Sequence, residues 1–146
     1  MSEITAAGVI IRCKDGRYLL GRATNHKEPC WTIFKGIQEG TELIRNTAIR
    51  ETKEETGIDI NSEPSLVYNL SKHSIFTYHI NSTDKDVYVF LLDDKHGIID
   101  SMELKCNSFF GPNNDIPEIT EFKRFSLSEL KDHLFPSQLG LIKVLK

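Results

Sequence analysis

The stretch that decides the fold is residues 36–58, GIQEGTELIRNTAIRETKEETGI, in which a glycine-containing loop leads into a helical pattern. The pattern predicts a helix over 41–56 that ends at Gly57, because glycine readily takes the left-handed conformation that closes a helix. Four positions share one stripe of this helix, since they recur at steps of four, three and four residues: Ile44, Ala48, Glu51 and Glu55. The first half of the stripe is apolar and suits a core, whereas the second half is acidic.

The acidic half of the stripe is electrostatically unfavourable as it stands. Glu54 adds a third carboxylate within about one turn, and the helix dipole is negative at this end. Three explanations are open at this point. The helix end could be exposed and screened by Lys53 and Arg50, or Arg50 could neutralise one glutamate in a structural ion pair. Alternatively, a divalent cation offsets the repulsion, and oxygen ligands suit Mg²⁺ or Mn²⁺.

The residues around this helix carry a long motif. It comprises Gly36, Glu42, Arg50, Glu51, Glu54, Glu55 and Gly57, and it resembles the signature of the Nudix hydrolases over 23 positions. Thr52 departs from it, because the family usually has an aliphatic residue there. The preceding Trp31–Gly36 segment is similar to a Trp-x-x-Pro-Lys-Gly segment of many Nudix enzymes, with Phe34 in place of the proline.

The resemblance implies a fold, a reaction and a cofactor. The fold would be an α/β/α sandwich with a central mixed sheet, formed by residues 1–146 as a single domain. The reaction would be hydrolysis of a pyrophosphate bond in a nucleoside diphosphate linked to another group, with Mg²⁺ or Mn²⁺ as cofactor. The implied metal ligands are Glu51, Glu54, Glu55 and the backbone carbonyl of Gly36.

The resemblance also implies roles in catalysis. Glu54 would act as a ligand or as the general base, Arg50 would orient a glutamate, and Glu42 would anchor the loop. A base from outside the motif is common in the family. Glu118 is the first candidate, because it starts the last expected strand beside a loop rich in Gly, Pro and Asn; Glu103 and Glu121 are the alternatives.

Substrate contacts are expected from basic and aromatic residues. Lys35 adjoins the metal loop, and Lys85 opens a segment, KDVYVFL, that is similar to a strand of diadenosine tetraphosphate hydrolases. We expect both lysines to contact phosphates; Tyr88 could stack on a base, with packing in the core as its alternative role. Other aromatic residues could take that stacking role: Phe76, Tyr78, Phe109 and Phe110.

The rest of the sequence predicts strands and helices on either side of the central helix. Strands are expected over 4–13, 17–23, 31–34, 66–68, 75–78, 86–92 and 118–125. Loops are expected over 24–29 and 107–117, the second being mobile. Ser126 or Ser128 would cap a helix through Phe135, and a terminal helix would cover 138–146 after Pro136.

Composition limits the partners. The chain has 146 residues and a net charge of −3, which makes stable nucleic-acid binding unlikely and leaves a small nucleotide as the expected ligand. No apolar segment approaches the roughly 18 residues of a membrane span. No secretory signal is visible, and the three cysteines lack metal-ligand spacing, so we expect a cytoplasmic protein with reduced thiols.

Three functional hypotheses follow from the sequence. The first is a pyrophosphatase for dinucleoside polyphosphates such as diadenosine tetraphosphate, with ADP-ribose or another nucleotide conjugate as the alternative substrate. The second is a Nudix module that senses a nucleotide without cleaving it. The third is a cation-binding structural domain without a nucleotide site. The sequence leaves the oligomeric state open.

Overall fold

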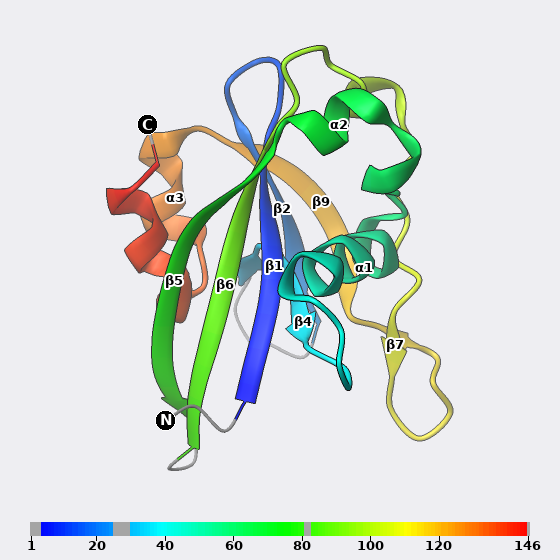
Figure 1. Ribbon diagram of the computed structural model, residues 1–146, viewed down its shortest axis with the longest axis vertical. Helices are drawn as coiled ribbons and strands as arrows, with labels where there is room; N and C mark the ends of the chain where they lie inside the picture. The colour runs from blue at the N-terminus through cyan, green and yellow to red at the C-terminus, as the bar shows by residue number, and fades with distance from the viewer. Residues whose placement is uncertain (1–3, 25–29, 81–82, 146) are drawn as a thin grey trace.

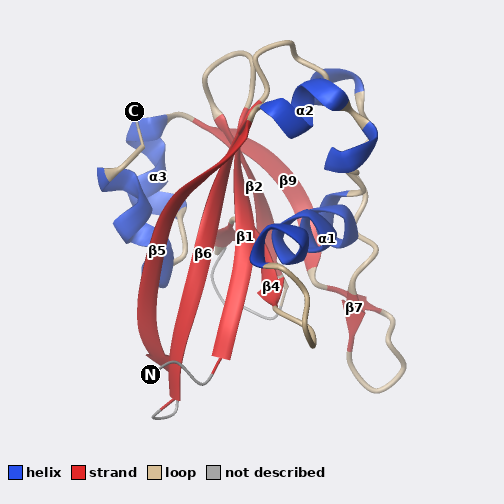
Figure 2. Ribbon diagram, viewed as in Figure 1, coloured by secondary structure: helices blue, strands red, loops and turns tan. Residues whose placement is uncertain are grey.

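A mixed β-sheet forms the centre of the fold, with helices on both of its faces (Figures 1 and 2). The computed structural model describes residues 4–24, 30–80 and 83–145. The arrangement of layers confirms the α/β/α sandwich with a mixed sheet that the resemblance implies.

The sheet is built around its first strand. Its members are β1 (Ile4–Arg12), β2 (Tyr18–Ala23), β3 (Trp31–Thr32), β4 (Phe34–Ile37), β5 (Leu70–Ile80), β6 (Thr83–Asp93) and β9 (Ile119–Phe125). Strand β6 runs parallel to β1 along one edge, and β5 pairs antiparallel with β6. The other edge of β1 is shared, because β2 pairs with its last residues and β4 pairs with 6–9. The sheet therefore opens between β2 and β4.

The segment that contains β3 and β4 lies in this opening. Strand β3 pairs with β2, and β4 pairs with β1 after one intervening residue, Ile33. Strand β9 covers the far edge of β2. The predicted single strand over 31–34 is therefore two short strands with different partners, because the chain changes from one strand of the opening to the other.

Two apolar clusters lie on opposite faces of the sheet. One is covered by α1 (Ile44–Thr56), α2 (Pro64–Tyr68) and the 3₁₀ turn Ile60–Ser62. The other is covered by α3 (Leu127–His133) and the 3₁₀ helix Pro136–Lys143. Alternate residues of β1 pack into one cluster or the other, as expected for a strand that is buried on both faces.

Helix α1 ends where the sequence predicts but begins later. Gly57 has a φ of 82°, and its N–H donates to the carbonyl of Lys53 at 2.8 Å, which closes the helix. The helix starts at Ile44 rather than at Thr41. Glu42 lies outside the helix because its carboxylate accepts a hydrogen bond from the hydroxyl of Thr47 at 2.8 Å and thereby fixes the loop ahead of the first turn.

Several other boundaries differ from the predictions. The strand expected over 66–68 is wrong, because these residues belong to α2, with Pro64 in its first turn and Leu66 packed in the core. The terminal helix expected over 138–146 is a 3₁₀ helix, Pro136–Lys143. The expected loop over 107–117 contains a short hairpin of β7 (Phe109–Phe110) and β8 (Ile116–Pro117). The predicted loop at 24–29 falls mostly outside the described residues.

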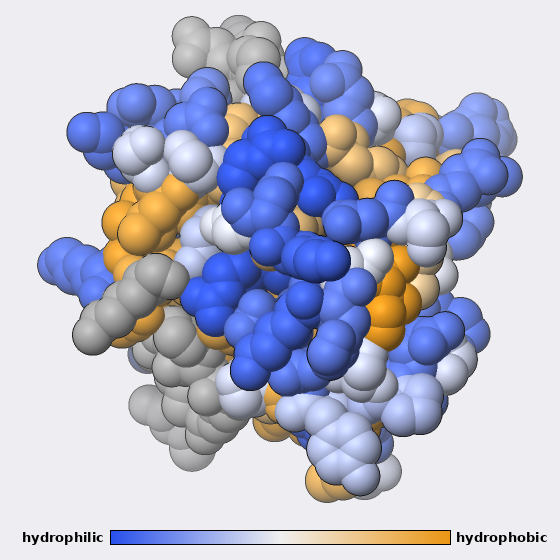
Figure 3. Space-filling view, turned by 90° about the horizontal axis from the view of Figure 1, so that it is seen from above, coloured by the Kyte–Doolittle hydropathy of each residue, from blue (hydrophilic) through white to orange (hydrophobic). Residues whose placement is uncertain are grey.

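The end of the sheet where β1 turns into β2 is polar. Seen from above, hydrophilic residues predominate there (Figure 3). Ion pairs join neighbouring segments at this end, with Arg12 3.0 Å from Asp93 and Arg124 3.2 Å from Asp15. The cysteines are free thiols. None of the helices in the described ranges is long and apolar enough to span a bilayer.

Candidate active site

Strand β4 and helix α1 meet at a glycine. The carboxyl group of Glu51 lies against the backbone of Gly36, where an added Cβ would be 2.0 Å from the carboxyl carbon and from Oε1. Any larger residue would occupy the space of that carboxylate. A glycine is therefore required at position 36, because the Glu51 carboxylate packs directly against the backbone there. The backbone of Gly36 and the side chain of Glu51, both predicted to bind the metal, are thus in contact.

Arg50 binds the acidic residues from the centre of the motif. Its Nε and Nη2 donate to the two oxygens of Glu42 at 2.8 and 3.1 Å. Its Nη1 donates to Glu51 at 2.7 Å and to Glu54 at 3.1 Å. Nη2 also donates to the carbonyl of Ile37 at 3.0 Å. One guanidinium therefore fixes the loop after β4 to the helix. The same group anchors Glu42 in that loop and orients Glu51 and Glu54 on the helix, the two roles that the resemblance implies.

Two of the three helix carboxylates are buried. Glu51 is 8% exposed and Glu55 is 5% exposed. Burial, with the neighbouring Glu54 carboxyl next, raises the pKa of Glu51 to about 7. Burial, followed by the charges of Glu51 and Glu118, raises the pKa of Glu55 well above its usual value. Glu51 and Glu55 are therefore not exposed to solvent, which rules out for them the explanation of an exposed helix end screened by Lys53 and Arg50. The carboxylates are crowded together, as the sequence predicted.

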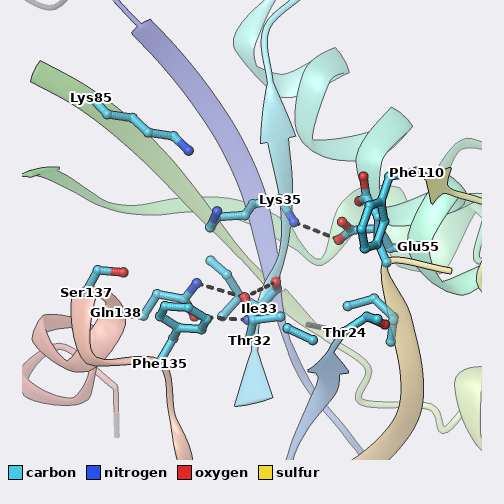
Figure 4. Close-up of a pocket in the computed structure, with 13 residues that line it drawn as sticks. Thr24, Thr32, Ile33, Lys35, Glu55, Lys85, Phe110, Phe135, Ser137 and Gln138 are labelled. Carbon is cyan, nitrogen blue, oxygen red and sulfur yellow. Dashed lines mark hydrogen bonds between the residues drawn. The ribbon is translucent and has the colours of Figure 1, made fainter. Parts of the chain in front are cut away.

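Glu55 connects this cluster to a pocket on the sheet. Its Oε1 accepts a hydrogen bond from the backbone N–H of Lys35 at 3.0 Å (Figure 4). Glu55 and Lys35 line a pocket of about 580 Å³, a volume typical of small-molecule sites. The pocket is also lined by Lys85 and Glu118, so the structure brings four of the predicted site residues together.

Charges are separated across the pocket. The side chain of Lys35 points away from Glu55 and lies on the same side as that of Lys85 (Figure 4). Burial lowers the pKa of Lys85. The carboxylates of Glu55 and Glu118 interact with each other and raise the pKa of Glu55. The pocket therefore offers an acidic side suited to cations and a basic side suited to phosphate oxygens.

Other candidates lie elsewhere. Tyr88 does not line the pocket and packs against the core cluster beneath α1. Glu121 binds Arg22 at 2.9 Å, and Glu103 is exposed, so neither alternative base reaches the pocket. Of the alternative stacking residues, Phe110 lines the pocket, and Phe109 is exposed and lines a separate groove. The side chains of Phe76 and Tyr78 lie outside the described part of the structure.

The sequence analysis missed the C-terminal wall of the pocket. This wall consists of Phe135, Ser137 and Gln138. Thr24, the residue after β2, and Thr32 of β3 also line the pocket (Figure 4). These residues carry no motif and are up to about a hundred positions away from the residues that they face. A local pattern in the sequence could not have identified them.

The donors at the helix end fit a divalent cation. Carboxylate and carbonyl oxygens are the ligands that Mg²⁺ and Mn²⁺ prefer, and a cation would offset the burial and the Glu54 repulsion that together raise the pKa of Glu51. Within the described ranges, no group of three His, Cys, Asp or Glu side chains is already arranged as a metal cage. This is consistent with Arg50 and the Lys35 N–H holding the carboxylates, and Mg²⁺ commonly uses few protein ligands together with water and phosphate oxygens.

Comparison with protein families agrees with this geometry. Residues 3–145 match the family model of the NUDIX domain. The chain belongs to the Nudix family. Its assignment as a Nudix pyrophosphohydrolase follows from this membership, and members generally use divalent metals. No curated protein matches the chain by sequence.

Solved structures of known proteins share the fold of this Nudix domain. A C. elegans Ap4A hydrolase is 22% identical, with 96% of this chain and 93% of that chain covered and a TM-score of 0.65. An E. coli dihydroneopterin triphosphate pyrophosphohydrolase is 19% identical, with 95% and 92% covered and a TM-score of 0.72. A bifunctional NMN adenylyltransferase/ADP ribose pyrophosphatase from Francisella tularensis, complexed with AMP and a Mn ion, is 19% identical, with 97% and 41% covered and a TM-score of 0.72. At these low identities, the structural similarity shows a common fold and nothing more specific.

Proposed function

We propose that this Nudix domain hydrolyses a pyrophosphate bond in a nucleotide derivative, with Mg²⁺ or Mn²⁺ held by Glu51, Glu54, Glu55 and the carbonyl of Gly36. The observation that carries the proposal is the buried carboxylate cluster beside a pocket with a basic side. Arg50 supplies one positive charge to Glu42, Glu51 and Glu54, so the partly buried cluster keeps an unfavourable excess of negative charge. A phosphoanhydride likewise needs neutralisation of its own negative charge. A metal-bound polyphosphate satisfies both requirements.

The residues of the chain divide the work of the reaction. When bound, the divalent cation would polarise phosphate oxygens and acidify the attacking water. Lys35 and Lys85 bind phosphate oxygens from the basic side of the pocket. If Glu54 is not a direct metal ligand, it would accept the proton of the attacking water, because its side chain is 41% exposed and can be reached by solvent. Glu118, beside Glu55, is the second candidate for that role.

We further propose a dinucleoside polyphosphate, such as diadenosine tetraphosphate, as the first substrate. Support comes from Lys85, which lines the pocket and begins the KDVYVFL segment of β6 that is similar to a strand of diadenosine tetraphosphate hydrolases. A conjugate with one base, such as ADP-ribose, is the second candidate. The pocket volume of about 580 Å³ favours it, since this space suits one small-molecule group.

Glu54→Gln tests the proposal. Turnover of a nucleotide panel with Mg²⁺ should fall about 10²–10⁴-fold, the contribution of a general base, while the melting temperature stays close to that of the wild type. Glu103→Gln is the matched control, because Glu103 is exposed and lies away from the pocket. Unchanged hydrolysis in Glu54→Gln would remove the assignment of Glu54. Tight binding of the nucleotides without product in the wild-type protein would instead identify a sensing module.

A further inference from the structure

The chain changes its strand-pairing partner at Ile33, directly ahead of β4, whose residues Lys35 and Gly36 contact the carboxylates of the site. Thr32 pairs with Gly21 of β2, and Phe34 pairs with Val9 of β1. Ile33 lies between these two pairings and is fully buried, so its backbone N–H needs a partner from elsewhere. That partner is a side chain from the C-terminal 3₁₀ helix.

Gln138 closes this gap in the sheet. Its Oε1 accepts a hydrogen bond from the N–H of Ile33 at 3.1 Å, and its Nε2 donates to Oγ1 of Thr32 at 2.8 Å (Figure 4). The Thr32 hydroxyl in turn donates to the carbonyl of Ile33 at 2.8 Å. Gln138 is only 1% exposed. A buried amide with both of its groups engaged holds one orientation, because each lost bond would leave a buried polar atom unsatisfied.

The segment that carries Gln138 is itself fixed to β3. The N–H of Phe135 donates to the carbonyl of Trp31 at 2.8 Å, and Leu134 forms a parallel bridge with Trp31. The N–H of Gln138 donates to the carbonyl of Phe135 at 2.8 Å. The amide therefore reaches Ile33 from a backbone that cannot shift independently of β3.

The site begins two residues after this crossover. The N–H of Lys35 holds Glu55, and the backbone of Gly36 is in contact with Glu51. A shift of the backbone at Ile33 would pass along β4 to both contacts, because β4 is only four residues long and extended. Gln138 thus acts on the carboxylates through the strand against which they lie.

We propose that Gln138 is a positioning residue for the metal site: through the N–H of Ile33 and the hydroxyl of Thr32 it sets the place of β4, on which Glu51 and Glu55 rest. This inference rests on the proposed metal-dependent hydrolysis. It assigns a role in metal binding to a residue that lies outside the Nudix motif and on the opposite face of the sheet from α1. Loss of such supporting partners typically weakens metal binding by 10–100-fold.

The test is metal affinity without substrate. Mn²⁺ titration, followed by calorimetry, should give a dissociation constant about tenfold weaker for Gln138→Met than for the wild type. Methionine has a similar length and removes both hydrogen bonds. Ser137→Ala is the matched control, because Ser137 lines the same pocket and its side chain has no hydrogen bond to β3 or β4 within the described residues. Its Mn²⁺ affinity should equal that of the wild type.

Other outcomes overturn the inference. A Gln138→Met protein that melts earlier but binds Mn²⁺ as the wild type does would show a purely structural role. A change in KM with unchanged Mn²⁺ affinity would show direct contact with substrate. If Gln138→Met does not fold, Thr32→Val is the second variant: it keeps the bond from the N–H of Ile33 to Gln138 and removes both bonds of the Thr32 hydroxyl. It should still weaken Mn²⁺ binding by about threefold, at the lower end of such effects, and an unchanged affinity refutes the coupling. A wild-type protein that binds no Mn²⁺ would refute the proposed function instead.

Discussion

Gly36→Ala should separate activity from folding. The new Cβ would be 2.0 Å from the carboxyl carbon of Glu51, whereas ordinary contact begins at 3.4 Å, so the carboxylate has to retreat by about 1.4 Å. A misplacement of about 1 Å in an active site can cost about 10²-fold in rate. We therefore expect kcat/KM to fall about 100-fold, which corresponds to about 2.7 kcal/mol of transition-state stabilisation.

The stability of Gly36→Ala should change far less. The group that must move is the end of a flexible side chain, and the retreat of Glu51 breaks its hydrogen bond from Arg50 at 2.7 Å. Such a charged bond contributes about 1.5–3 kcal/mol, and release of a buried carboxylate offsets part of that loss. The free energy of unfolding should fall by at most about 2 kcal/mol, or about 4–8 °C in Tm.

Two glycine controls complete the experiment. At Gly8 an added Cβ would lie 2.4 Å from the backbone carbonyl of Phe34 and from Cβ of Lys35, so β4 would have to move and Gly8→Ala should unfold at a much lower temperature. At Gly140 nothing lies within 4 Å, and Gly140→Ala should behave as the wild type. Turnover with Mg²⁺ and thermal melting of all three variants provide the readout. Wild-type turnover in Gly36→Ala, or destabilisation equal to that of Gly8→Ala, would refute the reasoning.

Two further substitutions probe the helix and its loop. Bonds from Arg50 and Thr47 lower the pKa of Glu42 from 4.5 to about 2, so its stabilising effect is complete above pH 4.5 and is lost as the pH falls towards 2. Urea unfolding should show Glu42→Gln to be about 1–3 kcal/mol less stable than the wild type at pH 7, with the difference shrinking at pH 2.5; a difference that is independent of pH would contradict this. Thr52 is fully buried, and its hydroxyl donates to the carbonyl of Ala48 at 2.8 Å. That carbonyl also faces the helix N–H four residues on, so Thr52→Val should change stability by less than about 1 kcal/mol and leave turnover intact, and a larger loss would show that the hydroxyl is essential.

The local parts of this protein could be predicted from its sequence. The end of α1 at Gly57 depends on one residue type, and the gathering of Glu51 and Glu55 depends only on helical spacing. Both are properties of neighbouring residues. The start of α1 was predicted three residues too early, because the interaction of Glu42 with Thr47 and Arg50 is a folded arrangement that helical periodicity does not report.

The parts that were missed depend on distant contacts or on the alternation of strands. Gln138 meets Ile33 across 105 positions, and no spacing rule connects them. The position of Tyr88 was available from the sequence, since an odd separation from Lys85 along one strand places the two side chains on opposite faces. The segment 66–68 has residues that favour strands, yet burial of Leu66 and 89% exposure of Tyr68 fit a helical turn after Pro64.

The guanidinium of Arg50 makes the effects of substitutions around it interdependent. Because one group serves Glu42, Glu51, Glu54 and the carbonyl of Ile37, removal of any single acceptor leaves donors that can be redistributed among the others. Pairs of changes among these residues should therefore show strong epistasis, and an Arg50 variant should mask the effects of its acceptors. Evolutionary drift at any one of these positions is constrained by the identity of the rest.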